Sequence, residues 1–227
     1  MKQKQLSLNP PVGSVDFGDL GRTTPISRTF GFDRGMPIDR YYIDAFLNQN
    51  QEAIRGQVLE IAEDTYSKRF GGSKVTQIDV LNPADQTGNR TIQTDLTKPV
   101  ELNKYECVIL TQTLHVLSKP ENAVRNLHKS LKSMGILLAT FPGISQISRY
   151  DMDRWGDYWR FTSLSARQLF EEVFGSGNVT IQTFGNVVTS LSFLHGLAVE
   201  DLQKSDLDYH DPDYELLITV KAVKGSL

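Results

Sequence analysis

The sequence has few of the features that mark secreted, membrane-spanning or nucleic-acid-binding chains. It contains a single cysteine, Cys107, so no internal disulfide can form. No run approaches the roughly 18 apolar residues of a membrane helix, and no apolar stretch typical of a signal peptide follows the first five residues. The net charge of -3 is not the broad positive charge that duplex nucleic acid attracts. We therefore expect a cytoplasmic protein with no nucleic-acid or membrane partner.

The composition fits one domain preceded by an irregular arm. The chain has 227 residues, 39% of them hydrophobic, which is enough for one well-packed core. Proline and glycine are dense in residues 1–36, and this density excludes long helices there. The same segment carries apolar side chains such as Phe17, Phe30 and Phe32. Residues 1–36 are thus expected to be an arm that docks as a strap or closes as a lid, and residues 37–227 the main domain.

Short apolar runs alternate with helical patterns along the main domain. Strands are expected at 57–61, 75–80, 91–95, 105–111, 135–141, 179–183 and 216–223. Helical spacing is clear at 37–54 and after an apparent capping box at Ser118 to Glu121. The segment 105–141 forms a complete βαβ unit, and its right-handed crossover makes the two strands parallel. The pattern predicts a doubly wound, mostly parallel α/β sheet.

Three of the expected strands end in a carboxylate: Glu60, Asp79 and Asp95. In an open α/β sheet, ligands bind beyond the carboxyl ends of the parallel strands. A carboxylate placed there can accept hydrogen bonds from both hydroxyls of a ribose. Because solvated acids also fall at strand ends, each acid alone is a weak signal.

Three segments carry a family resemblance. These are Tyr-Glu-Cys-Val-Ile-Leu-Thr-Gln-Thr-Leu-His-Val-Leu at 105–117, Asn-Leu-His-Lys-Ser-Leu-Lys-Ser-Met-Gly at 126–135 and Leu-Ala-Thr-Phe-Pro-Gly at 138–143. They closely resemble the class I S-adenosylmethionine-dependent methyltransferases, in the branch that acts on small molecules. Within that branch, the segment Trp155 to Thr162 resembles bacterial domains found beside or fused to glycosyltransferases. The resemblance covers roughly residues 37–223. It implies a Rossmann-like sheet of seven strands with an antiparallel last strand, and S-adenosylmethionine as cofactor.

The resemblance also implies the positions of the cofactor-binding residues. Glu60, Ile61 and Ala62 would line the methionine end, Asp79 would bind the ribose, and Val80 would lie against the adenine. Asp95 and Leu96 would flank the base, whereas Thr111, Gln112 and His115 would face the sulfonium. From the residues alone, Asp95 can also be a turn residue and His115 a structural histidine.

The first motif departs from the family pattern. The family has an acid followed by Gly-x-Gly-x-Gly, whereas this chain has Glu60-Ile61-Ala62-Glu63-Asp64-Thr65-Tyr66 and no glycine before Gly71. Glycine lets the backbone approach a ligand closely. The two acids would repel the cofactor's carboxylate and attract its ammonium. We therefore expect a shifted methionine tail or weak binding. The absence of Gly-x-Gly-x-x-G also argues against a nicotinamide-binding domain.

An insertion at 144–161 alternates aromatic and charged residues, a composition that can stack on a ring and hydrogen-bond hydroxyls. We interpret Trp155, Trp159 and Arg160 as acceptor-binding residues, although both tryptophans can instead pack the insertion against the sheet. Arg34 and Tyr42, near the first helix, are further candidates. Asp39 and Arg40 at the start of that helix are either solvated or reach the ligands.

These observations favour methyl transfer to an oxygen or nitrogen of a small, hydroxylated molecule such as a sugar or a secondary metabolite. His115 is the first candidate for a general base, because its ordinary pKa lies near neutral pH. No metal site is expected, since the acidic residues between 201 and 213 fit no known ligand spacing. The alternative is an inactive methyltransferase-like binding or scaffold module. The expected partner is a small-molecule acceptor, and a homodimer is left open.

Overall fold

The structure is a computed structural model that describes residues 10–82, 91–92, 96, 98 and 101–226. Its α-helices are α1 (Ile38–Gln49), α2 (Pro120–Ser130), α3 (Arg149–Met152), α4 (Ser163–Phe174), α5 (Val187–Leu194) and α6 (Lys204–Asp208). Its strands are β1 (Gly56–Ile61), β2 (Val75–Leu81), β3 (Thr91–Ile92), β4 (Tyr105–Thr111), β5 (Leu131–Pro142), β6 (Val179–Phe184) and β7 (Leu217–Val223).

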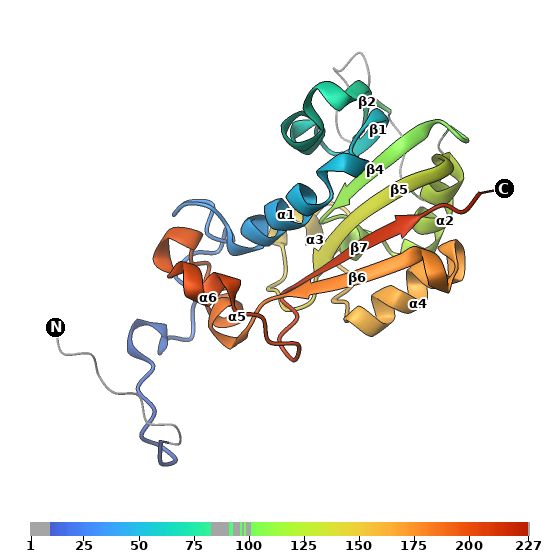
Figure 1. Ribbon diagram of the computed structural model, residues 1–227. Helices are drawn as coiled ribbons and strands as arrows, with labels where there is room; N and C mark the ends of the chain where they lie inside the picture. Colours follow the sequence, from blue (N-terminus) through green and yellow to red (C-terminus); the bar gives the residue numbers. More distant parts are fainter. Residues whose placement is uncertain (1–9, 83–90, 93–95, 97, 99–100, 227) are drawn as a thin grey trace.

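The strands form one sheet in the order β3-β2-β1-β4-β5-β7-β6 (Figure 1). Strands β3, β2, β1, β4 and β5 pair in parallel, and β7 is antiparallel to both β5 and β6. The predicted mostly parallel, Rossmann-like α/β fold is thus confirmed. The outermost strand β3 is represented by two residues only, because 93–95 lie outside the described part of the chain.

Helices cover both faces of the sheet. On one face, Val124 and Leu127 of α2 and Phe170 of α4 pack on Val108 and Leu137. On the other face, Ile43 and Phe46 of α1, Phe193 of α5 and Leu207 of α6 pack on Ile109 and neighbouring strand residues. The carboxyl ends of β4 and β5 lie near α1 and α3 (Figure 1).

The βαβ unit is present as expected, but its predicted capping box is not. Helix α2 begins at Pro120, and its N-cap residue Lys119 makes no side-chain capping hydrogen bond. Proline suits this first position because it has no N–H group to satisfy. A true capping box occurs instead at α4, between Thr162 and Ser165.

The arm divides into a docked part and a part that stands away from the domain. The amides of Ile26 and Ser27 donate to the carbonyl of His195, and Pro37 forms a bridge with Ala198. The described residues before Ile26 project away from the sheet, with Val12 and Phe17 exposed (Figure 1). The docked part runs toward α1 and so brings residues 28–32 to the open edge of the sheet. In the described part of the chain, no helix is long and apolar enough to cross a membrane.

Candidate functional site

A cavity of about 530 Å³ lies at the carboxyl ends of β4 and β5. Its wall combines four parts of the chain: the docked arm, the start of α1, the segments after β4 and β5, and the insertion. Contributing residues include Phe30, Asp39, Gln112, His115 and Ser148. A volume of this size falls within the range of small-molecule sites, and the edge is the one where α/β sheets bind ligands.

Unusual backbone conformations gather around this edge. Among the described residues, five non-glycines have positive φ, and Phe30 (57°), Ala62 (74°) and Gln112 (46°) are three of them. Phe30 and Gln112 line the cavity, and Ala62 follows β1. Such conformations cost free energy and persist where the surrounding structure enforces them, which is often at functional sites. The residue type alone does not predict these left-handed conformations.

Glu60 at the end of β1 is committed to the turn that follows it. Its carboxylate accepts hydrogen bonds from the amides of Tyr66 (3.0 Å) and Ser67 (2.7 Å), and the side chain is buried. Burial raises the pKa of Glu60 above its usual range, although these hydrogen bonds oppose the shift. Glu60 therefore fixes the shape of the first loop, while contact with the methionine end stays a prediction.

Ala62 takes the backbone conformation that glycine adopts most readily. The Ala62 amide donates to the carbonyl of Leu81, and Asn82 Nδ2 donates to the carbonyl of Ala62, so the loop is tied to the end of β2. The acids after it are engaged locally: Glu63 accepts from the Thr65 hydroxyl and Asp64 pairs with Lys68 at 2.6 Å. Ile61, beside Ala62, is buried in the core.

Asp79 does not have the free carboxylate that the ribose prediction assumed. It lies two residues before the end of β2, and its oxygens bind Gln77 Nε2 (2.9 Å), the Tyr105 hydroxyl (3.0 Å) and Lys104 Nζ (2.8 Å). Burial favours the neutral form, but these three partners hold the pKa of Asp79 below its usual value. The structure thus presents Asp79 as part of a polar network between β2 and β4, and ribose binding stays a prediction.

The other proposed cofactor residues are placed unevenly. Asp95 lies outside the described residues. Leu96 is buried and its carbonyl accepts from Asn126 of α2, Val80 is half-buried in β2, and Thr111 ends β4. Of the nine predicted cofactor residues, Gln112 is on the cavity wall.

His115 lies on the cavity wall, as expected of a residue that faces the reaction. Its side chain is 7% exposed, and its Nδ1 is buried with no hydrogen-bond partner in the described part of the chain. Burial lowers the pKa of His115 to about 4, so the imidazole is neutral at neutral pH. A buried nitrogen without a partner is costly unless a ligand satisfies it.

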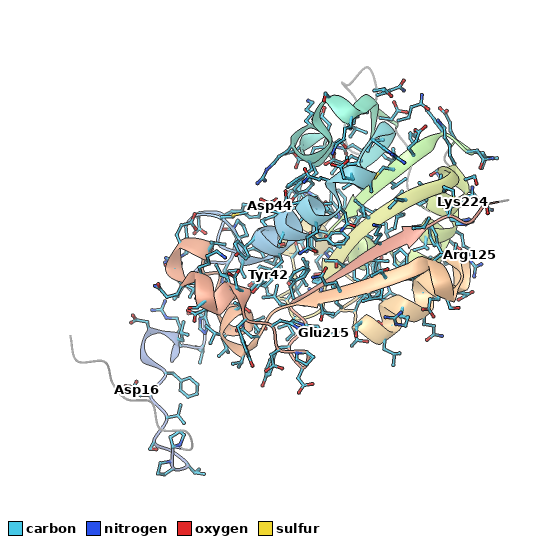
Figure 2. All side chains as sticks on the ribbon, in the orientation of Figure 1. Asp16, Tyr42, Asp44, Arg125, Glu215 and Lys224 are labelled. Carbon is cyan, nitrogen blue, oxygen red and sulfur yellow. The ribbon has the colours of Figure 1, made fainter. Side chains whose placement is uncertain are left out.

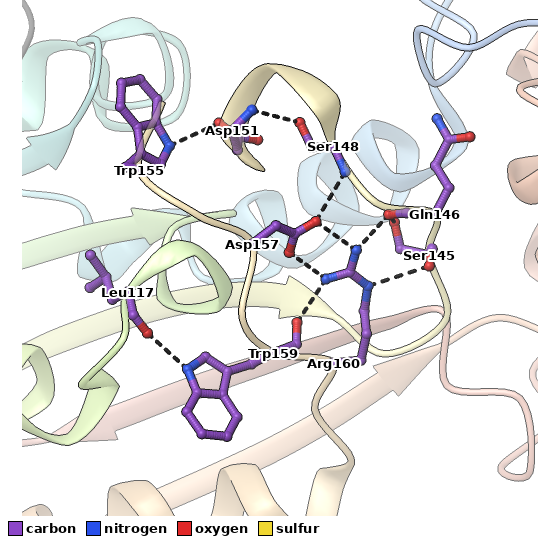
Figure 3. A network of polar contacts seen from close by, with 9 residues as sticks. All are labelled: Leu117, Ser145, Gln146, Ser148, Asp151, Trp155, Asp157, Trp159 and Arg160. Carbon is purple, nitrogen blue, oxygen red and sulfur yellow. Dashed lines mark hydrogen bonds and ion pairs between the residues drawn. The ribbon is translucent and has the colours of Figure 1, made fainter. Parts of the chain in front are cut away.

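Arg160 is the centre of a network that closes the insertion (Figure 3). Its guanidinium binds both oxygens of Asp157 (2.6 and 2.9 Å) and donates to the carbonyls of Ser145, Gln146 and Trp159. The Ser148 amide also donates to Asp157 at 3.0 Å. Arg160 lines the cavity with its donors engaged in this network, and acceptor binding by Arg160 stays a prediction.

The two tryptophans are not on the cavity wall. The indole N–H of Trp155 donates to Asp151 at 3.1 Å, and that of Trp159 donates to the carbonyl of Leu117 at 2.8 Å (Figure 3). Both rings are partly exposed, at 45% and 43%. Their polar atoms hold the insertion together and against the segment after β4, while acceptor binding by their rings stays a prediction.

Tyr42 and Arg34 make other contacts within the chain, and acceptor binding by them stays a prediction. Tyr42 lies on the buried face of α1, stacks on Phe184 and donates to the carbonyl of Leu207 at 2.9 Å (Figure 2). Arg34 forms a two-point ion pair with Asp201, at 3.1 and 2.7 Å. Tyr42 therefore packs the core, and Arg34 anchors the arm.

Two acids lie on the cavity wall. Asp39, in the first turn of α1, is buried and is contacted by Gln112, and Asp157 is bound to Arg160. Of the two alternatives left open for Asp39, the structure places it at the cavity, whereas Asp157 was not among the candidates. Within the described residues, no group of three or more histidine, cysteine or acidic side chains could hold a metal ion.

Part of the sequence and the overall fold are similar to those of known proteins. Residues 56–139 match a family described as a methyltransferase domain. The sequence comparison with curated proteins found no match. Several solved structures are similar in fold. The N-methyltransferase NodS of Bradyrhizobium japonicum, solved with S-adenosyl-L-homocysteine, is 12% identical with a TM-score of 0.53 over 88% of this chain and 94% of that one.

A Galdieria sulphuraria protein, described provisionally as a sarcosine dimethylglycine methyltransferase, is 15% identical with a TM-score of 0.54, over 83% of this chain and 89% of that one. Identities this low establish the fold and leave the substrate open. The strand order, the antiparallel β7 and the match over residues 56–139 agree with one another. The chain therefore has the fold of these methyltransferases, and its residues 56–139 are similar to a methyltransferase domain.

Proposed function

We propose that the protein transfers a methyl group from S-adenosylmethionine to an oxygen or nitrogen of a small, hydroxylated molecule such as a sugar or a secondary metabolite. The observation that carries the proposal is the cavity at the carboxyl ends of β4 and β5, with the buried, neutral His115 on its wall. The match of residues 56–139 to a methyltransferase domain supports the reaction class.

The residues at this edge are suited to the cofactor. Ala62 holds the loop after β1 in a left-handed conformation, and Gln112 does the same after β4, so both backbones turn away sharply at the strand ends. By the family resemblance, Ala62 would border the methionine end, Val80 and Leu96 the adenine, and Thr111 and Gln112 the methyl side. When bound, S-adenosylmethionine supplies a methyl group already activated on a sulfonium.

The protein's own contribution is alignment in a site from which water is excluded. Holding an acceptor in line with the methyl group can supply up to about 7 to 11 kcal/mol of the barrier in favourable cases. The Arg160–Asp157 network fixes the insertion over the cavity, and the docked arm forms the opposite wall. A neutral His115 on the cavity wall can accept the hydrogen of an acceptor hydroxyl at its unprotonated ring nitrogen and thereby orient the hydroxyl oxygen.

A methyl-transfer assay tests the proposal. Purified protein is incubated with methyl-labelled S-adenosylmethionine and a panel of monosaccharides, nucleotide sugars, phenols and small amines, and the labelled products are counted. We expect label in a hydroxylated or amino acceptor, and at least a tenfold lower rate in His115→Asn. The matched control is His195→Asn, because His195 Nδ1 is also buried without a partner among the described residues but lies off the cavity wall. Label that reached only added RNA or protein would refute the acceptor class.

A further inference from the structure

Asp39 and Arg40 place opposite charges side by side on the cavity wall. Both belong to the first turn of α1. Asp39 is 8% exposed, and in the described part of the chain the only side-chain hydrogen bond to its carboxylate comes from Gln112 Nε2, at 3.3 Å. That distance is beyond the usual range for such a bond. The Asp39 carboxylate is thus buried with a weak side-chain partner.

Arg40 has no close ion-pair partner among the described residues, although Asp39 and Glu63 act on its charge at longer range. Its guanidinium lies 3.5 Å from the Tyr66 hydroxyl and 5.9 Å from the centre of the Phe32 ring. No ion pair within 4.0 Å joins Arg40 to another described residue, Asp39 included. Charged groups shielded from water are expensive unless they are paired. The two neighbours together would be satisfied by a ligand that carries one positive and one negative group.

Asp39 and Arg40 contact residues that follow the two central strands, near the loop after β1. Gln112, which contacts Asp39, follows β4, and Tyr66, which contacts Arg40, follows the turn after β1. The pair therefore spans the ends of the two central strands. At the same edge, the loop after Glu60 lacks glycine and carries Glu63 and Asp64, whose charges disfavour a carboxylate.

We propose that Asp39 and Arg40 bind the amino acid tail of the cofactor, with the Asp39 carboxylate taking its ammonium and the Arg40 guanidinium its carboxylate. This inference rests on the proposed function, because it takes S-adenosylmethionine as the ligand. It assigns binding of the amino acid tail to α1, because the loop after β1 lacks glycine and carries two acids. Arginine and carboxylate form strong charge-assisted hydrogen bonds, as do carboxylate and ammonium.

The test compares two ligands that differ in the tail. S-adenosylhomocysteine carries the ammonium and the carboxylate, whereas 5′-methylthioadenosine keeps the nucleoside and lacks both. Calorimetric titration of the wild-type protein should give at least thirtyfold tighter binding of S-adenosylhomocysteine. In Asp39→Asn and in Arg40→Gln, binding of S-adenosylhomocysteine should weaken at least tenfold, and binding of methylthioadenosine should change less than threefold.

Asp44→Asn is the matched control, because Asp44 lies on the same helix and pairs with Arg69 outside the cavity. Its affinities should stay within twofold of the wild-type values. Unchanged methylthioadenosine binding also reports that a variant is folded. If the wild-type protein binds the two ligands equally well, or if the variants lose affinity for both equally, this inference is overturned while the proposed function stands. If neither ligand binds, the proposed function fails and the inference with it.

Discussion

At the scale of single residues, Ala62 carries a cost that glycine would avoid. Its φ of 74° lies in the left-handed region, where a Cβ atom costs roughly 1 to 2 kcal/mol. We predict that Ala62→Gly raises the free energy of unfolding by up to about 1 kcal/mol, after allowing for the greater chain entropy of glycine. Urea denaturation measures this change.

Met134 provides a matched control for Ala62, because it is exposed, also has a positive φ (62°) and lies outside the cavity wall. Met134→Gly should stabilise the protein in a similar way, but only Ala62→Gly should alter the affinity for S-adenosylhomocysteine. A lower unfolding free energy for Ala62→Gly would show that the left-handed turn is not a source of strain.

His115 should make stability depend on pH. Burial lowers its pKa to about 4 in the folded protein, against an ordinary value of 6.5. The unfolded chain therefore binds more protons between these values, so the stability contributed by the neutral ring is complete above about pH 6.5 and is lost as pH falls toward 4. At pH 4.5 the loss attributable to His115 should be on the order of 2 kcal/mol, since each unit of pKa difference corresponds to about 1.4 kcal/mol.

Urea titrations at pH 7 and pH 4.5 check this prediction. The fall in unfolding free energy should be smaller in His115→Asn than in the wild-type protein. Equal falls in the wild-type and His115→Asn proteins would contradict the assigned burial.

The sequence could identify acids near strand ends but not which of them are free. Asp79 fits the pattern for a ribose-binding acid, yet Lys104 and Tyr105, about 25 positions later in the chain, occupy its carboxylate. Asp39 sits in an ordinary first helical turn, and only the packing of α1 over β4 brings it to Gln112. These outcomes depend on contacts distant in sequence, which residue patterns do not encode.

At the scale of elements, the insertion depends on the Arg160–Asp157 network. A guanidinium binds a carboxylate at two points, whereas lysine offers a single point charge. We predict that Arg160→Lys lowers the unfolding free energy by about 1 to 3 kcal/mol, because hydrogen bonds to charged groups in a partly buried site are lost. The variant should also be cut faster by protease between residues 145 and 160.

The control for Arg160 is Arg167→Lys, which alters an exposed pair with Glu171 on α4. Exposed pairs contribute at most about 1 kcal/mol, so this change should have little effect. If the two substitutions gave the same stability and the same cleavage pattern, the network would not be what holds the insertion.

Regular elements were predictable where a periodic pattern decides them. The apolar runs at β1, β4 and β5 and the stripe of α2 gave positions close to those observed. The start of α2 was wrong in detail, because Pro120 replaces the expected side-chain cap. The composition of the insertion suits stacking on a ligand and packing equally well. The hydrogen bonds to Asp151 and Leu117 show how the two indoles are held, and acceptor binding by the tryptophans stays a prediction.

At the scale of the whole molecule, the sheet topology could be predicted from the order of the strands and helices, whereas the cavity could not. Alternation of strands and helices restricts the sheet to few arrangements, and the antiparallel last strand was implied by the family resemblance. The cavity needs the arm, α1, the strand ends and the insertion to meet, and the arm reaches it because His195 and Asp201 anchor residues 26–36.

The measurement that most directly tests the central claim is a calorimetric titration of the full chain with S-adenosylhomocysteine, with NAD as the comparison ligand. Because the fold and the match over residues 56–139 point to a methyltransferase, we predict saturable binding at one site per chain and no heat from NAD. Absence of heat with S-adenosylhomocysteine at millimolar concentration, in protein shown to be folded by circular dichroism, would contradict the proposed function. Saturable binding of NAD in its place would indicate a different class of cofactor.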